Sequence, residues 1–120
     1  MQTKTFKDLI VWQKAYKLTL EIYNFTEGFP KSETYGLAQQ IRRAAVSIPS
    51  NIAEGYGRNS TGDYVRFLQI SLGPLYELQT QLEISRRLSF LKDSDCQELN
   101  GICKEVSKML VSLINKLSVA

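Results

Sequence analysis

The chain has 120 residues, a length that corresponds to one domain spanning residues 1–120. Its 43% of hydrophobic residues is typical of a soluble globular protein. No apolar run approaches the roughly eighteen residues that a transmembrane helix needs, and no signal peptide is recognisable at the start of the chain. These features exclude a membrane-spanning protein and predict a cytoplasmic one.

The formal net charge is only +3, and the excess of positive charge is unevenly distributed. Residues 1–60 contain eight Lys and Arg against five Asp and Glu, whereas residues 61–120 contain seven of each kind. The basic half permits contact with phosphate or with another acidic surface, but it does not require such contact.

The sequence gives little support for a catalytic site or a metal site. The chain has no histidine, which is the commonest general base and metal ligand. Cys96 and Cys103 lie seven residues apart on a predicted helix, roughly 10 Å along its axis, which is too far for a disulfide and favours core packing. We therefore expect no enzyme activity, and we assign no catalytic residue, cofactor or metal ligand.

The first predicted helix spans residues 7–27, and Thr5 with Asp8 resembles a capping box before it. Its apolar side chains fall on two stripes, which predicts burial on two sides, either by bundle neighbours or by another subunit. Lys14 and Lys17 occupy the remaining face, which is either solvated or in contact with a ligand. The first stripe consists of Leu9, Trp12, Tyr16, Leu20 and Tyr23; the second consists of Val11, Ala15, Leu18, Ile22, Phe25 and Phe29.

The second predicted helix follows Ser32, its expected N-cap, and ends near residue 55 or 56. Pro49 in its middle predicts a bend and deprives the Ala45 carbonyl of its usual donor. That carbonyl needs water or a side chain as its partner, and the nearby side chains able to donate are those of Ser47, Ser50 and Asn51.

The outer face of this second helix carries a polar stripe flanked by arginines. We expect Glu54 to form a structural ion pair with an arginine such as Arg42 or Arg43. The glycines that follow lack the GxGxxG spacing of a phosphate loop and are interpreted as residues that end a helix. The stripe consists of Gln39, Arg43, Ser47, Ser50, Glu54 and Arg58.

The third predicted helix spans residues 63–88, is capped by Ser60 or Thr61, and should bend before Pro74. Ser94 is the expected cap of the fourth helix, whose apolar residues alternate spacings of four and three in a heptad seam. Its seam consists of Leu99, Cys103, Val106, Leu110, Leu113 and Leu117. Four long helices with short connectors predict an all-α fold, an antiparallel up-down-up-down four-helix bundle with bent helices 2 and 3.

Residues 40–58, QIRRAAVSIPSNIAEGYGR, carry a family resemblance, as do FKDLIVWQKAYKLTLEIY (6–23), FPKSETYGL (29–37), YVRFLQISLG (64–73) and YELQTQL (76–82). The chain resembles the four-helix bundle proteins encoded by intervening sequences in bacterial 23S rRNA genes, also labelled the S23 ribosomal protein family. The family pattern has Gly-Ser where this chain has Gly73 and Pro74. The family resemblance therefore says less about the bend of helix 3 than about the rest of the fold.

The resemblance implies a homo-oligomer, specifically a pentameric ring. The chain is also similar to the accessory variability determinant of diversity-generating retroelements. This similarity implies a partner that is either a nucleic acid, RNA rather than DNA, or another protein. The six tyrosines could stack on bases, but most occur at core spacings and are interpreted as residues at the edge of the core.

Two hypotheses follow from the residues and the resemblance together. In the first, the protein binds structured RNA through phosphate contacts of a tentative set: Arg42, Arg43, Arg58, Lys14 and Lys17. In the second, it is a structural or adaptor protein that binds another protein. The sequence leaves open whether the arginine stripe faces phosphate or another subunit.

Overall fold

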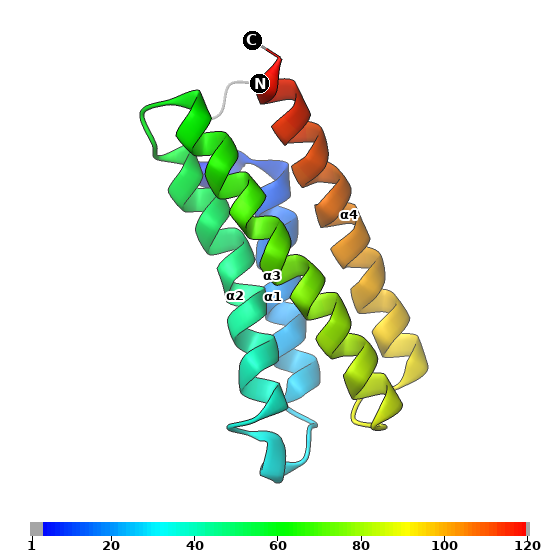
Figure 1. The fold of residues 1–120 in the computed structure, drawn as a ribbon. Coiled ribbons are helices and arrows are strands. Elements are labelled where there is room, and N and C mark those ends of the chain that lie inside the picture. The colour runs from blue at the N-terminus through cyan, green and yellow to red at the C-terminus, as the bar shows by residue number, and fades with distance from the viewer. Residues whose placement is uncertain (1–3, 120) are drawn as a thin grey trace.

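The computed structural model describes residues 4–119 and contains four long α-helices. Each helix packs against two others, in the cyclic order α1, α2, α3, α4. Figure 1 shows successive helices running in opposite directions, so the start of α1, the α2–α3 turn and the end of α4 share one end of the molecule. The predicted four-helix bundle is confirmed. The elements are η1 (Phe6–Asp8), α1 (Ile10–Thr26), η2 (Lys31–Glu33), α2 (Leu37–Tyr56), α3 (Thr61–Arg87) and α4 (Asp93–Ser118).

The bundle is rod-shaped, with principal extents of 47 × 23 × 22 Å. Both internal prolines, Pro49 and Pro74, lie within continuous helices, so helices 2 and 3 are single elements as predicted. Between residues 4 and 119, no helix combines the length and the apolar character that crossing a membrane requires.

The predicted caps at Thr5 and Ser60 are both present, but Thr5 caps the 3₁₀ turn η1, and α1 begins at Ile10 and not near residue 7 as predicted. The Thr5 hydroxyl accepts from the Lys7 N–H at 3.1 Å, and the Asp8 carboxylate accepts from the Thr5 N–H at 3.1 Å. Backbone hydrogen bonds from Lys4 and Thr5 hold the pKa of Asp8 below its usual value. Ser60 caps α3 by accepting from the Asp63 N–H at 3.1 Å.

Two other predicted caps are wrong. Ser32 lies inside the 3₁₀ turn η2, and α2 begins only at Leu37, whose N–H donates to the Glu33 carboxylate at 3.0 Å. The Glu33 side chain reaches forward over the turn. Its carboxylate accepts the hydrogen bond from a backbone N–H that a serine cap would otherwise satisfy. Ser94 lies inside α4, because the N-cap is Lys92, two residues earlier, and the helix begins at Asp93.

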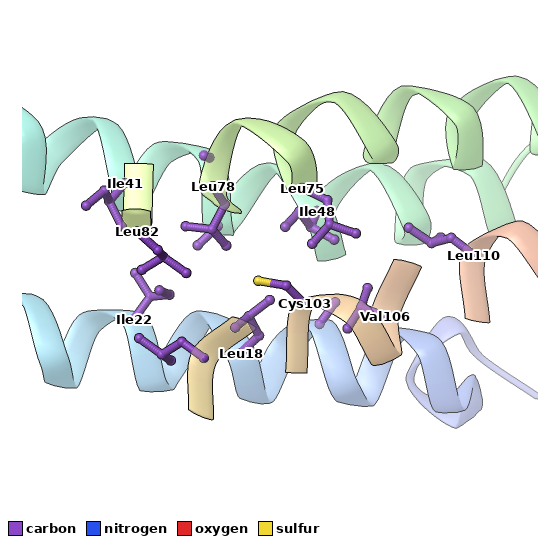
Figure 2. Packing of buried hydrophobic residues seen from close by; sticks show 14 of the residues in the cluster. Leu18, Ile22, Ile41, Ile48, Leu75, Leu78, Leu82, Cys103, Val106 and Leu110 are labelled. Atoms are coloured by element: carbon purple, nitrogen blue, oxygen red, sulfur yellow. The ribbon is translucent and has the colours of Figure 1, made fainter. Parts of the chain in front are cut away.

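The core is built from the inward faces of all four helices, as Figure 2 shows. Most of the predicted apolar positions are buried, but Leu88, the last residue of the predicted third helix, is exposed. Cys96 and Cys103 are buried free thiols, and burial raises the pKa of Cys103 to about 12. That thiol therefore stays protonated and acts as an apolar core residue. Residues labelled in Figure 2 are Leu18, Ile22, Ile41, Ile48, Leu75, Leu78, Leu82, Cys103, Val106 and Leu110.

The partner of the Ala45 carbonyl comes from another helix. The hydroxyl of Thr19 in α1 lies 3.1 Å from the Ala45 oxygen and 2.9 Å from the Ala15 oxygen of its own helix. Its single proton is shared between these two acceptors. The prediction that Ser47, Ser50 or Asn51 could supply this bond is wrong: Ser47 and Asn51 donate to other carbonyls, and Ser50 is exposed.

Helices α2 and α3 approach each other closely at Gly55. A β-carbon at this position would lie 2.7 Å from the Phe67 β-carbon and 3.2 Å from the Tyr64 carbonyl oxygen. Those distances are too short for van der Waals contact, so the residue must lack a side chain for the helices to pack at this spacing.

Candidate nucleic-acid interface

The five predicted cationic residues do not form one surface. The Lys14 ammonium lies 3.4 Å from Glu105 of α4, at the junction of α1 and α4. Arg42 and Arg43 lie on α2 near the opposite end of α1, and Arg58 lies just beyond the far end of α2, more than roughly 20 Å away along its axis. The bundle thus distributes these residues over its length and over three helix junctions, α1–α4, α1–α2 and α2–α3.

The Arg42 side chain is bound to other residues of the protein. Its Nε donates to the Thr26 hydroxyl at 2.8 Å, and its Nη2 donates to the Tyr23 carbonyl at 3.2 Å. The guanidinium also lies 4.5 Å from the centroid of the Tyr23 ring and 3.6 Å from the Glu27 carboxylate. These bonds satisfy polar groups at the C-terminus of α1 and join it to α2, so the Arg42 guanidinium is directed at the protein.

Arg58 also has partners within the protein. It pairs with Glu54 at 3.2 Å and lies 4.6 Å from the centroid of the Phe67 ring. Arg66 of α3 lies 4.8 Å from the same centroid and pairs with Asp63 at 3.6 Å. We expected Glu54 to pair with Arg42 or Arg43, but it pairs with Arg58, one turn ahead. Residues four apart are neighbours on a helix surface.

Only two of the five predicted residues have a charged group without a hydrogen bond or ion pair to residues 4–119. The side chains of Arg43 and Lys17 are exposed and form no ion pair or hydrogen bond with any residue from 4 to 119. They stand on different helices, α2 and α1, so the structure does not bring them together. Of the predicted set, these two are the cations that can contact a phosphate without breaking an existing contact.

Arg43 borders a depression of about 580 Å³ between the end of α1, the connector before α2 and the first half of α2. This volume lies within the range of pockets that bind small ligands. We call it the Arg43 pocket. Its lining residues are Tyr23, Thr34, Tyr35, Gln39, Arg42, Arg43, Val46 and Ser47.

The exposed tyrosines of this pocket were not predicted. Tyr35 is 88% exposed and Tyr23 is 41% exposed, whereas the sequence pattern placed most tyrosines at the edge of the core. Tyr16 and Tyr76 are 48% and 51% exposed, which fits side chains at the edge of the core, whereas Tyr35 lies well outside it. The sequence prediction placed Tyr35 in the first turn of the second helix, whereas the structure places it in the connector before Leu37, outside any helix.

Exposed apolar side chains lie on α1 and α2, and one of them, Val46, lines the Arg43 pocket. The side chains of Tyr16, Leu20 and Val46 are 48%, 54% and 40% exposed. Trp12 is half-buried and stacks on Tyr16 with ring centroids 5.0 Å apart. The bundle therefore covers the second predicted stripe of helix 1 and leaves most of the first stripe uncovered.

Comparison with known proteins places the sequence in a family. Residues 7–112 match the family model described as 23S rRNA-intervening sequence protein. The chain belongs to this family. A member of the S23 ribosomal protein family from Bacteroides thetaiotaomicron, a protein of unknown function with a crystal structure, is 25% identical to this chain. The match covers 87% of this chain and 97% of that one, with a TM-score of 0.80.

Among curated proteins, none matches this member of the 23S rRNA-intervening sequence protein family. The Arg43 pocket, formed by residues 23–47, lies inside the region that the family model matches. The comparisons therefore establish the family and agree with the helical fold.

Proposed function

We propose that this family member is a non-enzymatic nucleic-acid-binding protein that prefers structured RNA. The observation that carries the proposal is the Arg43 guanidinium, which is exposed, has no partner among residues 4–119 and borders a pocket with two exposed tyrosines. Guanidinium groups suit phosphate because they offer several donors in a planar fork. Aromatic rings beside them suit bases.

The contact set differs from the one that the sequence suggests. Arg43 and Lys17 contact phosphate directly, whereas Arg42, Arg58 and Lys14 mainly hold the bundle together through their protein partners. Arg42 still shapes the site, because its guanidinium lies against the Tyr23 ring and both residues line the Arg43 pocket.

Assembly would multiply these few cations. A chain of net charge +3 has a weak field by itself, but five copies in the ring that the resemblance implies would carry about +15. The exposed apolar surface of Tyr16, Leu20 and Val46 is suited to contact between copies, because such side chains favour burial.

The test is a salt series of RNA binding with an Arg43→Ala variant. For the wild type, we expect the logarithm of the binding constant to fall linearly with the logarithm of the salt concentration. The substitution should weaken binding of all RNA sequences similarly and lower the slope by about one per contacting subunit. Fluorescence anisotropy of a labelled RNA hairpin measures both quantities, and the same sequence as DNA measures the preference.

Arg87→Ala is the matched control, because Arg87 is another exposed arginine without a hydrogen bond or ion pair to residues 4–119, and it lies on α3. It removes the same charge away from the Arg43 pocket and should leave the slope nearly unchanged. Absence of binding at about 50 mM salt, or a slope near zero for the wild type, would overturn the proposal.

A second candidate function is an adaptor that binds another protein. The exposed apolar surface on α1 and α2 favours it, since exposed aromatic and aliphatic side chains often mark protein interfaces. In that case Arg43→Ala would leave partner binding intact, whereas a charge at Leu20 would abolish it. Measuring both variants against a co-purifying partner separates the two functions.

A further inference from the structure

The Arg43 pocket has features that distinguish an unpaired nucleotide from a paired one. Tyr35 lines the pocket with 88% of the side chain exposed, so its ring is available for stacking. Stacking requires access to the face of a base, and in a duplex both faces are covered by neighbouring base pairs. An A-form major groove is also too deep and narrow for side chains to enter.

The turn that carries Tyr35 is held in place on both sides. The Glu33 carboxylate accepts from the Leu37 N–H at 3.0 Å, and the Gly36 N–H donates to the Glu33 carbonyl at 3.1 Å. A β-carbon on Gly36 would lie 2.8 Å from the same Glu33 carboxylate oxygen, so an added side chain would displace the end of the Glu33 side chain that caps α2. The backbone that carries the Tyr35 ring is therefore positioned before a ligand arrives.

Polar groups of α2 complete the site. Gln39, Arg43 and Ser47 follow one another at intervals of four residues, which places them in a row along one side of the Arg43 pocket. The Arg43 guanidinium can bind a phosphate, and the Gln39 amide offers both a donor and an acceptor to the edge of a base. Arg42 is held against Tyr23 and forms part of the wall.

We infer that the Arg43 pocket binds one unpaired nucleotide of a structured RNA, such as a bulge, with the base stacked on Tyr35 and its phosphate on Arg43. This inference rests on the proposed RNA-binding function and names the feature of the RNA that the site selects. Because stacking uses the face of the base, the site tolerates any of the four bases.

The experiment compares a blunt RNA duplex with the same duplex carrying a single-nucleotide bulge. The wild type should bind the bulged duplex roughly five- to 150-fold more tightly, the range that corresponds to the stacking of one base on an aromatic ring. Tyr35→Ala should remove this preference and keep the affinity for the blunt duplex. Tyr35→Phe should retain the preference, since stacking needs the ring and not the hydroxyl.

Tyr76→Ala is the control, because Tyr76 is an exposed tyrosine on α3, outside the pocket, and its loss should not alter the preference. With 2-aminopurine as the bulged base, binding should quench its fluorescence in the wild type and not in Tyr35→Ala. Circular dichroism of each variant checks that the helices persist.

Equal affinity of the wild type for bulged and blunt duplexes, both with a normal salt slope, would overturn this inference and leave the proposed function standing. So would a Tyr35→Ala variant that keeps the preference for the bulge. Failure to bind any RNA would instead overturn the proposed function itself.

Discussion

Arg42 and Arg43 are neighbours in the sequence, yet their side chains have different roles. Consecutive residues of an α-helix point about 100° apart, so one guanidinium faces α1 and the other faces solvent. Arg42 donates to Thr26 and to the Tyr23 carbonyl, whereas Arg43 has no side-chain partner among the residues that the structure describes. Position on the helix, and not residue type, decides which arginine is available to a ligand.

Replacing glycine by alanine should change stability in opposite directions at a buried and at an exposed helix position. Gly55→Ala should lower the free energy of unfolding by about 1–3 kcal/mol, because the added methyl group would overlap Phe67 across the α2–α3 contact. Gly101→Ala should raise it by about 0.5–1 kcal/mol, since nothing lies within 4 Å of the added atom and alanine favours a helix. Urea unfolding at equilibrium measures both changes.

The two glycine variants control for each other, because they make the same chemical change in helices of the same bundle. A neutral Gly55→Ala variant would contradict the close approach of α2 and α3, and a destabilised Gly101→Ala variant would contradict the open space around Gly101.

At the scale of an element, α2 continues through a proline because α1 compensates for the lost hydrogen bond. Pro49 has no N–H for the Ala45 carbonyl, and the Thr19 hydroxyl lies 3.1 Å from that oxygen. The core face of α2 is also continuous across Pro49, which is itself buried, so packing opposes a break at this point. Tertiary contacts thus preserve a helix that local propensity would interrupt.

Thr19→Val should lower the free energy of unfolding by about 1–2 kcal/mol, because it keeps the side-chain shape and leaves the Ala45 carbonyl unsatisfied. In a Pro49→Ala background the same substitution should cost less, since residue 49 then supplies an N–H to that carbonyl. A double-mutant cycle in urea measures this coupling free energy.

Thr80→Val is the control for the threonine, because Thr80 is exposed and its hydroxyl donates only to Tyr76 one turn back. It should change stability by less than about 0.5 kcal/mol. A coupling free energy of zero between positions 19 and 49 would show that the hydroxyl does not compensate for the proline.

At the scale of the whole molecule, the bundle covers only one of the two apolar stripes of α1. Val11, Ala15, Leu18 and Ile22 are buried, whereas Tyr16 and Leu20 remain exposed. Four helices in cyclic order leave each helix with an outer face, and on α1 that face carries large apolar side chains. A second copy of the chain would remove them from water.

Leu20→Lys should therefore reduce the mass of the assembled protein in solution toward that of one chain, because a charge would be buried at the contact between copies. Leu20 is 54% exposed within one chain, so the substitution should leave the helical content nearly unchanged. Light scattering measures the mass, and circular dichroism measures the helices.

Val111→Lys provides a comparison, because Val111 is also exposed but lies on α4, away from this stripe. A wild-type protein that is monomeric at every concentration tested would contradict the assembly, and with it the increase in charge that the RNA proposal uses.

The sequence alone determined the four helices and most of the core. Apolar residues at intervals of three and four specify a helix and its buried face locally, so the seam from Leu99 to Leu110 and the caps at Thr5 and Ser60 were predictable. The match to a single family over residues 7–112 likewise follows from the sequence.

The tertiary structure decided which polar groups are free. The partners of Arg42 lie 15 to 19 residues before it, that of Lys14 lies on the last helix, and Thr19 reaches Ala45 across the α1–α2 junction. Periodicity describes one helix at a time, so it cannot predict contacts between helices that meet only after folding. For that reason the sequence suggested five cations for the site, and the fold leaves two of them, Arg43 and Lys17, free to contact a ligand, with only Arg43 beside exposed Tyr35 in one pocket.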